Sequence, residues 1–292
     1  MSYSNSSNPK SKGCYDSGLI IDSEKFNKVV KKLREFFLAR DFVEVHTQNR
    51  LSILAACEDP FNVQTFEYAG ETWPLIQTGQ MWLEYEILKR PEAAGYFCLT
   101  TSYRLEPNPV PGRHDIIFPM FEFEFKGDMN ELMELQKDLL VHLGYDKSNF
   151  YVNDYKSIAK EFGTVELDHG DEERLYKEKS PVSFITDFPE FTSPFWNMRR
   201  NGSDDTSKKV DVILSGMETF GSAEREVDKE VMRRTFNTIM EGRYKDKLYE
   251  LFGRERTEGE LEEYFQLNFI KRSGCGIGLT RLIKSMEKEG LL

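Results

Sequence analysis

The sequence predicts an α+β fold in which a mostly antiparallel sheet is flanked by helices. Three observations lead to this prediction. Residues 115–126 alternate apolar and acidic side chains, which is typical of an antiparallel strand with two unlike faces. Residues 26–37 and 129–143 place apolar side chains at helical spacing. Strand-like and helical segments are mixed along the chain without an internal repeat, a pattern that fits the α+β class.

The N-terminal half is predicted to contain a tail, helices and strands. Residues 1–20 are rich in Ser, Asn, Lys and Gly, so we expect a flexible tail, followed by one domain over residues 21–292. Asp22 and Ser23 suit the N-cap of the first helix. The other expected elements are a strand at 42–46, loops and short strands at 50–78, a helix at 80–90 and a strand at 95–104.

The C-terminal half is predicted to continue the sheet after a charged insertion. Residues 145–180 are polar and charged, which predicts a surface insertion or a small helical subdomain. The other expected elements are strands at 183–186 and 209–214 with a polar loop at 201–209 between them, helices over 227–263, a strand at 264–270, a Gly-rich turn at 274–278 and a final helix.

The composition excludes several classes of protein. The chain has 292 residues, 39% of them hydrophobic and 13% aromatic, enough for a sizeable core in one large domain or two small ones. The 50 acidic and 39 basic residues give a net charge of −11, which provides no global field for a nucleic-acid backbone. There is no run of 18 apolar residues that would span a membrane, and no secretory signal is expected. The four Cys and four His are scattered, so we expect a cytoplasmic protein without disulfides or a zinc site.

The first segment that carries chemistry covers residues 102–124. Arg104 and Glu106 lie two apart and would share one face of a strand, and a GRH turn at 112–114 follows. On the next predicted strand, Phe118 and Glu122 share a face. A flat aromatic ring beside an arginine and carboxylates suits a stacked purine whose triphosphate is bound by cations. An ordinary hairpin with a surface ion pair and core aromatics would explain the same residues.

The second segment is VDVILSGMETFGSAER at residues 210–225. Asp211 and Glu218 are able to bring two carboxylates together, and Mg²⁺ bound to a polyphosphate takes such oxygen ligands. The alternative is a solvated strand face followed by a turn.

The third segment is GCGIGLTR at residues 274–281. Glycines at 274, 276 and 278 remove every second Cβ from a strand-to-helix junction, which permits close approach of a ligand or of another backbone. Arg281 falls in the first turn of the next helix and offers a two-pronged contact to phosphate. A tight packing turn with a surface arginine is the alternative.

Together the three segments follow the motif order of the class II aminoacyl-tRNA synthetases, and the chain resembles the aspartyl/asparaginyl branch of that class. SYRLEP…GRH…F resembles the second class motif, GMETFGSAERE the strand with the metal-binding Glu and substrate-binding Arg, and GCGIGLTR the third motif. TGQMWLE and CEDPF resemble two substrate-binding segments of the branch. The resemblance covers about residues 22–292 and implies a catalytic domain with a six-to-seven-stranded antiparallel sheet.

The resemblance also implies the residues of the site. The domain would bind bent ATP with Mg²⁺ and form an aminoacyl-adenylate, with the charges of Arg104, Arg281 and Glu218-bound Mg²⁺ aiding the reaction. The implied ATP site consists of Arg104 at the α-phosphate, Phe118 and Arg281 on the two faces of adenine, Glu106, Arg113 and His114 at the adenine and terminal phosphates, and the glycines Gly276 and Gly278. Asp211 and Glu218 would hold Mg²⁺. Glu58, Gln80, Glu84 and Arg225 would bind the amino acid.

Two poses of the amino acid remain open. Glu58 and Gln80 would receive its ammonium group in the familial pose, while Glu84 accepts from an asparagine amide. Aspartate bound in reverse would instead turn its ammonium group to Glu84 and its β-carboxylate to ATP. Arg225 is needed in both poses.

The expected function is ATP-dependent activation of aspartate or asparagine by a homodimer that associates through residues 25–46. Branch members carry an anticodon-binding barrel ahead of this domain, and none is recognisable before residue 20, so tRNA is not the expected acceptor. In domain content, the chain most resembles the asparagine synthetases related to asparaginyl-tRNA synthetase, in which ammonia attacks the activated aspartate. Transfer to another small molecule, a protein or tRNA, and a non-catalytic binding module, remain alternatives. Thr47 is followed by Gln48 where the first class motif carries Pro.

Overall fold

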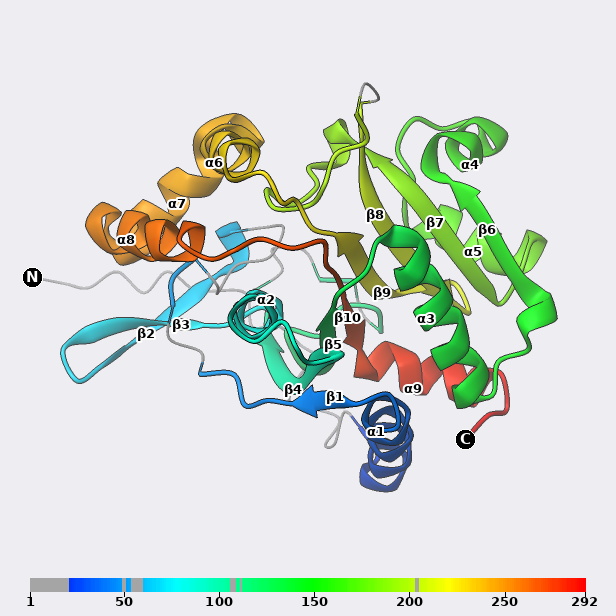
Figure 1. Ribbon diagram of the computed structural model, residues 1–292. Coiled ribbons are helices and arrows are strands. Elements are labelled where there is room, and N and C mark those ends of the chain that lie inside the picture. Colours follow the sequence, from blue (N-terminus) through cyan, green and yellow to red (C-terminus); the bar gives the residue numbers. More distant parts are fainter. Residues whose placement is uncertain (1–20, 49–50, 54–59, 106–108, 111, 203–204) are drawn as a thin grey trace, which may run out of the picture.

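An eight-stranded sheet forms the centre of the computed structural model, which describes residues 21–48, 51–53, 60–105, 109–110, 112–202 and 205–292 (Figure 1). The strands lie in the order β1-β4-β5-β10-β9-β8-β7-β6. Their bounds are Phe42–Glu44 (β1), Gly95–Tyr103 (β4), Ile117–Phe125 (β5), Phe150–Asp154 (β6), Val182–Pro189 (β7), Thr206–Leu214 (β8), Met217–Glu224 (β9) and Ser273–Gly278 (β10). A separate hairpin pairs β2 (Gln64–Tyr68) with β3 (Glu71–Leu75).

The predicted α+β class with a mostly antiparallel sheet is confirmed, with one correction at the edges. The two outermost pairs, β1 with β4 and β6 with β7, are parallel, whereas all pairings between them are antiparallel. The sheet is therefore mixed and has eight strands, rather than the six to seven antiparallel strands that the resemblance implied.

Helices cover both faces of the sheet (Figure 1). On one face α1 (Ser23–Leu38), α3 (Met129–Leu143) and α9 (Leu279–Lys288) share a core with alternate residues of β5, such as Phe121 and Phe123. On the other face α2 (Gln80–Lys89), α6 (Lys229–Thr238), α7 (Arg243–Phe252) and α8 (Arg254–Phe265) form a second core. The helices α4 (Tyr155–Phe162) and α5 (His169–Glu178) pack on the β6–β7 end of the sheet. In the described part of the chain, no helix is both long and apolar enough to cross a membrane.

The first helix shows why the N-terminal prediction holds. Asp22 is its N-cap, and the Asp22 carboxylate accepts hydrogen bonds from the backbone N–H groups of Glu24 and Lys25 at 2.9 and 3.0 Å. The apolar stripe that includes Val29, Leu33 and Phe37 is buried against the chain's own sheet. The predicted flexible tail, residues 1–20, lies outside the described residues.

Three predictions about the elements are wrong. Tyr264 and Phe265 end α8, and residues 266–270 form no strand. The Gly-rich segment predicted as a turn is the central strand β10. Residues 206–209, predicted as loop, begin β8. The predicted insertion at 145–180 does contain two helices, but it also supplies the edge strand β6.

Candidate active site

A large cavity lies on the face of the sheet that α2 covers. It encloses about 1110 Å³ of empty space when counted out to its open mouth, which is ample for a nucleotide together with a small second ligand. The predicted site residues that line the cavity are Gln80, Glu84, Arg104, Arg113, His114, Phe118, Glu218, Arg225, Gly276, Gly278 and Arg281. The predicted residues Glu58 and Glu106 lie outside the described residues.

Arg104 and Phe118 face each other across the β4–β5 hairpin. The Cζ atom of Arg104 lies 5.6 Å from the centroid of the Phe118 ring. Arg104 follows the last residue of β4, so the predicted placement of Arg104 on a strand face is wrong. Its position is fixed instead by its backbone N–H, which donates to the Ile116 carbonyl at 2.9 Å. The half-buried ring and the guanidinium form a surface on which a purine is able to stack.

Two more arginines share this end of the cavity. Arg281 donates from Nη1 to the Glu218 carbonyl at 2.6 Å and from Nη2 to the Arg113 carbonyl at 3.4 Å. Arg113 donates from Nη1 to the Gly216 carbonyl at 3.2 Å, and its Nη2 contacts the Glu172 carboxylate. Backbone carbonyls therefore hold two of the three guanidinium groups at this end of the cavity, and the three together suit the charge of a polyphosphate.

His114 lies beside these arginines. Its Nδ1 accepts a hydrogen bond from the Val110 N–H at 3.2 Å, which fixes the imidazole against the turn. The His114 ring also contacts the His169 ring edge-on, with 5.2 Å between the centroids. His114 thus lies between the turn and α5.

The sequence prediction did not include Glu172, which reaches this end of the site from α5. The Glu172 carboxylate accepts from Arg113 and from the Glu218 N–H, the latter at 2.6 Å. Burial and the nearby negative charge of Glu218 raise the pKa of Glu172 to about 7. Segment 145–180 thus contributes to the site, which its surface-like composition concealed.

Asp211 and Glu218 converge beside Gly221. A Cβ atom at Gly221 would lie 3.4 Å from Glu218 Oε1 and 3.9 Å from Asp211 Oδ1. Burial alone would raise the pKa of Glu218, but Lys209 and the three nearby arginines outweigh it and lower that pKa. Asp211 is buried and does not line the cavity, and Lys209 Nζ lies 3.3 Å from its Oδ2.

The two carboxylates fit a Mg²⁺ ion that is shared with a ligand. Across the described residues, no cluster of three or more His, Cys, Asp or Glu side chains is arranged to hold a metal. Mg²⁺ commonly takes only one or two protein carboxylates and completes its octahedron with phosphate oxygens and water. Asp211 and Glu218 suit such an ion, with Lys209 as a competitor for Asp211.

The glycines of β10 serve two purposes. A Cβ atom at Gly274 would overlap the Glu124 carboxylate, and one at Gly276 would lie 2.8 Å from Met120 Cε. At Gly278 the nearest atom to such a Cβ is the Thr219 carbonyl oxygen, at 3.9 Å. The first two glycines therefore let β10 pack against the side chains of β5, and the third leaves room within the cavity.

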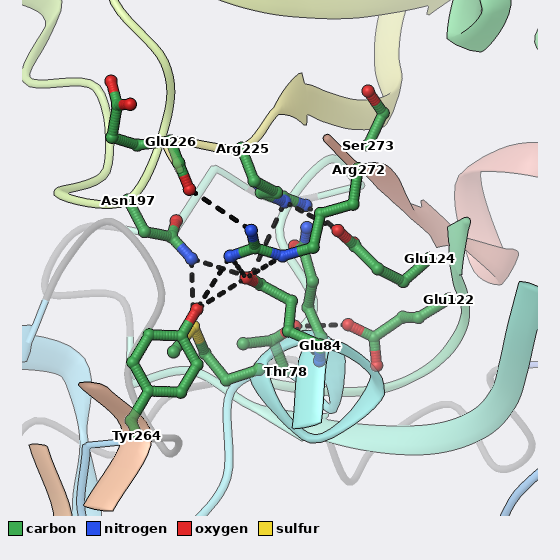
Figure 2. Close-up of polar contacts among 12 residues, drawn as sticks. Thr78, Glu84, Glu122, Glu124, Asn197, Arg225, Glu226, Tyr264, Arg272 and Ser273 are labelled. Atoms are coloured by element: carbon green, nitrogen blue, oxygen red, sulfur yellow. Dashed lines mark hydrogen bonds and ion pairs between the residues drawn. The ribbon is translucent and has the colours of Figure 1, made fainter. Parts of the chain in front are cut away.

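The start of α2 is held by a buried carboxylate. Glu122 is fully buried and accepts from the Gly79 N–H at 2.8 Å and from the Thr100 hydroxyl at 2.6 Å. The Thr78 hydroxyl also donates to Glu122, as Figure 2 shows. Gly79 is the N-cap of α2. Glu122 thereby fixes Gln80, the first residue of α2, at the cavity wall.

Arg225 lies at the other end of the cavity. It is 1% exposed, and it donates from Nε and Nη2 to the two oxygens of Glu124, each at 3.3 Å. Its Nε also lies 3.6 Å from Glu84 Oε1. The side-chain amide of Gln80 lies against the same guanidinium. Of the predicted amino-acid-binding residues, Gln80, Glu84 and Arg225 therefore do come together.

Glu84 lines the cavity, but both of its carboxylate oxygens already have protein partners. Its Oε2 accepts from Tyr264 Oη at 2.8 Å and from Arg272 Nε and Nη2 at 3.0 and 2.5 Å (Figure 2). Its Oε1 accepts from Asn197 Nδ2 at 2.7 Å. Both oxygens are engaged because α2 packs against α8 and the segment that precedes β10.

The two buried glutamates differ in protonation. Burial alone would raise the pKa of Glu84, but the charges of Arg272 and Arg225 outweigh it and hold that pKa below its usual value. Burial raises the pKa of Glu124 to about 8, and the charge of Glu84 adds to this effect. Burial therefore favours the protonated form of Glu124, whereas the arginines favour the ionised form of Glu84.

Four residues of this cluster were not predicted from the sequence: Glu124, Asn197, Tyr264 and Arg272. Arg272 stands two residues before the Gly-rich motif, and its charge next to that small, uncharged segment was an available signal. Asn197 within an aromatic run was another such signal. Tyr264 offered none, because the apolar segment around it reads as core.

Comparisons with known proteins agree with this geometry. The family described as tRNA synthetases class II (D, K and N) matches residues 23–290. The chain is 23% identical over 284 residues to the aspartate–tRNA(Asp/Asn) ligase of Saccharolobus solfataricus, a match that covers 87% of this chain and 62% of that protein.

Solved structures show the same fold. The asparaginyl-tRNA synthetase of Pyrococcus horikoshii, complexed with asparaginyl-adenylate, is similar with a TM-score of 0.74 and 19% identity over 91% of this chain and 64% of that chain. The asparaginyl-tRNA synthetase of Entamoeba histolytica, also complexed with asparaginyl-adenylate, gives 0.72 and 17% over 91% and 63%. The chain thus spans less than two thirds of the length of these relatives. The predicted class II fold is confirmed, and the chain belongs to the class II tRNA synthetase family (D, K and N).

Proposed function

We propose that this protein uses ATP and Mg²⁺ to activate aspartate as an aminoacyl-adenylate and that ammonia then takes up the activated group to give asparagine. Asparagine is the second candidate substrate, because Gln80 and Arg225 suit the carbonyl oxygen of an amide as well as a carboxylate. Asparagine would be activated at its α-carboxylate, by the same substitution at phosphorus.

One observation carries the proposal. A single cavity has three arginines and Phe118 at one end and Arg225 with Gln80 at the other. The first end matches a nucleotide with its phosphates, and the second matches a small anionic or amide side chain. A domain that joins an amino acid to a nucleotide needs both ends in one enclosure, because the reacting groups must meet.

The residues support an in-line substitution at phosphorus. A β-carboxylate oxygen of aspartate, bound in the reverse pose, attacks the α-phosphorus, the bond to the bridging oxygen breaks, and pyrophosphate leaves with the electron pair. Arg104 at the α-phosphate offsets the repulsion between the two anions. Arg113 and Arg281 hold the leaving phosphates, and Mg²⁺ held by Asp211 and Glu218 would supply further positive charge there.

The acceptor step needs no nucleophile from the protein. The nitrogen of ammonia attacks the activated carbonyl carbon, the bond to the AMP oxygen breaks, and the nitrogen loses one proton. The relatives named above act on tRNA, and a protein or another small molecule would also complete the reaction. The net charge of −11 favours a small acceptor over a nucleic acid.

Product analysis tests the proposal. The protein is incubated with ATP, Mg²⁺ and aspartate, with and without ¹⁵N-ammonium and with and without tRNA, and the products are identified by mass spectrometry. We expect AMP, pyrophosphate and ¹⁵N-asparagine in equal amounts only where ammonium is present. AMP formed only with tRNA would reject ammonia as the acceptor, and no AMP under any condition would reject the activation reaction.

A further inference from the structure

Lys209 places a positive charge beside the two carboxylates that fit Mg²⁺. The Nζ atom of Lys209 lies 3.3 Å from Asp211 Oδ2, and both residues belong to the same face of β8. Lys209 is 8% exposed, and its Nζ lies 4.6 Å from the centroid of the Phe188 ring. Tyr155 of α4 packs on that ring, with 5.1 Å between the centroids. The ammonium group is therefore buried between an aromatic wall and a carboxylate.

The same charge acts on Glu218. Gly221 lies opposite Asp211 in the β8–β9 ladder, and because Gly221 has no side chain the carboxylates of Asp211 and Glu218 converge there. Burial alone would raise the pKa of Glu218, and of the nearby cations that lower this pKa Lys209 has the largest effect. One lysine thus compensates two buried carboxylates, as a metal ion would.

The end of the cavity that matches a nucleotide is rich in positive charge even without a metal. Lys209 joins three arginines there. The carboxylates that face these four cations are those of Asp211, Glu218 and Glu172. A divalent ion a few Å from the ammonium group would meet a repulsion that costs at least about 10-fold in affinity, even at the dielectric constant of water. The phosphates of a nucleotide reverse this balance, because they bring several negative charges to the same place.

We propose that Lys209 is a resident counter-ion of the metal site: it compensates Asp211 and Glu218 in the free protein, so that Mg²⁺ binds only together with the nucleotide. This inference rests on the proposed function, because it concerns the metal of the same cavity. Lys209 acts through the two carboxylates and is therefore a positioning residue, with no contact to the substrate assigned to it.

Binding of Mn²⁺, followed by electron paramagnetic resonance of the free ion, tests the inference without turnover. Mn²⁺ takes the same oxygen ligands as Mg²⁺. It is titrated into the protein alone and into the protein saturated with the non-reactive analogue α,β-methylene-ATP, and a titration of the analogue alone corrects for the metal that it binds in solution. The wild-type protein should bind Mn²⁺ at least about 10-fold more tightly with the analogue than without it. Without the analogue, Lys209→Met should bind Mn²⁺ at least about 10-fold more tightly than the wild-type protein.

The predicted gain of metal binding separates this role from a merely structural one, because a loss of folding would not produce it. Lys209→Gln is also neutral and should show the same gain. Lys209→Arg keeps the charge and should behave as the wild-type protein does. Lys177→Met, which removes an exposed lysine on α5 paired with Glu173, is the matched control and should change nothing.

A further pair of variants covers the case in which neither neutral variant folds. Asp211→Asn alone leaves the ammonium group beside Glu218, whereas Asp211→Asn combined with Lys209→Met removes the buried ion pair, a change that proteins often tolerate. With the analogue bound, the double variant should bind Mn²⁺ at least about 10-fold more tightly than Asp211→Asn. Equal affinities of these two variants would reject the inference.

The remaining outcomes separate the inference from the proposed function. If the wild-type protein binds Mn²⁺ as tightly without the analogue as with it, or if folded Lys209→Met and Lys209→Gln keep the wild-type affinity, the inference is overturned while amino-acid activation stands. If the gain is found but no amino acid supports ATP–pyrophosphate exchange, the proposed function fails and the role of Lys209 stands.

Discussion

The acidic residues of the alternating strand β5 take part in the candidate site. Phe121 and Phe123 enter the core with α1, and the intervening Glu122 and Glu124 point to the opposite face, as the alternation predicts. An antiparallel strand of this kind usually turns its polar face to water, but both glutamates are fully buried. Each therefore needs partners, and those partners build the amino-acid end of the cavity.

Replacement of Arg225 tests that end of the site directly. Arg225→Ala removes the guanidinium that Gln80, Glu84 and Glu124 surround. Amino-acid binding should then be lost, while ATP binding changes by less than about 3-fold, because the three nucleotide-end arginines are untouched. Calorimetric titrations with ATP and with each amino acid check this, with Arg233→Ala as the control. An equal loss of affinity for ATP and for the amino acid would mean that the variant disturbs the whole cavity.

The proton on Glu124 predicts a pH dependence of aspartate use. The charged groups that face Glu124 are Arg225 directly after β9, Glu84 on α2 and Arg272 directly before β10. Because the pKa of Glu124 is about 8, this group is protonated below that pH and ionised above it. An ionised Glu124 repels the substrate carboxylate, so the KM for aspartate should rise up to about 10-fold per pH unit above 8 and stay level between 6 and 7.

The control for this profile is the Glu124→Gln variant. It keeps a hydrogen-bonding side chain of the same size and loses the titrating proton. Its KM for aspartate should be independent of pH over the same range, and the KM for asparagine should vary little in either protein. A wild-type profile that stays flat from pH 7 to 9.5 would mean that Glu124 does not titrate with substrate binding.

Helices and strands were predictable from the sequence where the hydrophobic residues clearly followed either the helical or the strand period. The helices at 23–38 and 129–143 and the strand at 117–125 follow their hydrophobic periods and their N-caps, Asp22 and Asp128. The Gly-rich strand β10 was predicted as a turn because its strand character comes from its neighbours. Glu124 and Met120 of β5 fill the space that the glycines leave. The residues of β10 themselves do not reveal that β5 is their partner strand.

Two other errors have separate causes. Residues 264–270 carry alternating apolar side chains, but Tyr264 and Phe265 belong to the last turn of α8 and pack into its core. The edge strand β6 was missed because its side chains are only partly buried, so it lacks a clear apolar face. Most residues of the candidate site lay in recognisable motifs. Glu172 and Arg272 did not, since tertiary packing alone brings them there.

The helix α5 gives a prediction at this scale. Glu172 links Arg113 to the backbone of β9, so α5 fixes one of the arginines at the nucleotide end. Glu172→Ala should release Arg113 and raise the KM for ATP by about 3- to 10-fold, with little change in the KM for the amino acid. Initial rates of pyrophosphate exchange check this, and Glu178→Ala on the exposed side of α5 is the control. A lower KM for ATP would show that Glu172 instead competes with the phosphates for Arg113.

At the scale of the whole molecule, the two ends of the sheet differ in role. The β6–β7 end is covered by α4 and α5. The other end stops at the short edge strand β1, beside α1 (Figure 1). Leu38 and Val43 are 53% and 46% exposed there, whereas the apolar stripe of α1 is buried within the chain itself. The exposed apolar side chains, and not the stripe, are thus available for an interface.

This edge leads us to predict a homodimer. Two copies would associate through α1 and β1, and light scattering at micromolar concentration should give about twice the chain mass of 34.1 kDa. Leu38→Glu combined with Val43→Glu should yield monomers that remain folded, because both side chains face solvent in the single chain. A wild-type monomer at those concentrations would reject the dimer.

The central claim is that one cavity activates an amino acid with ATP, and amino-acid-dependent ATP–pyrophosphate exchange tests it most directly. The wild-type protein is assayed with Mg²⁺ and each amino acid in turn, beside Arg104→Ala. We predict exchange with aspartate, or with asparagine, that disappears when Mg²⁺ is chelated and falls by about 10²-fold or more in Arg104→Ala. Exchange at background level with every amino acid, from a folded protein, would contradict the account.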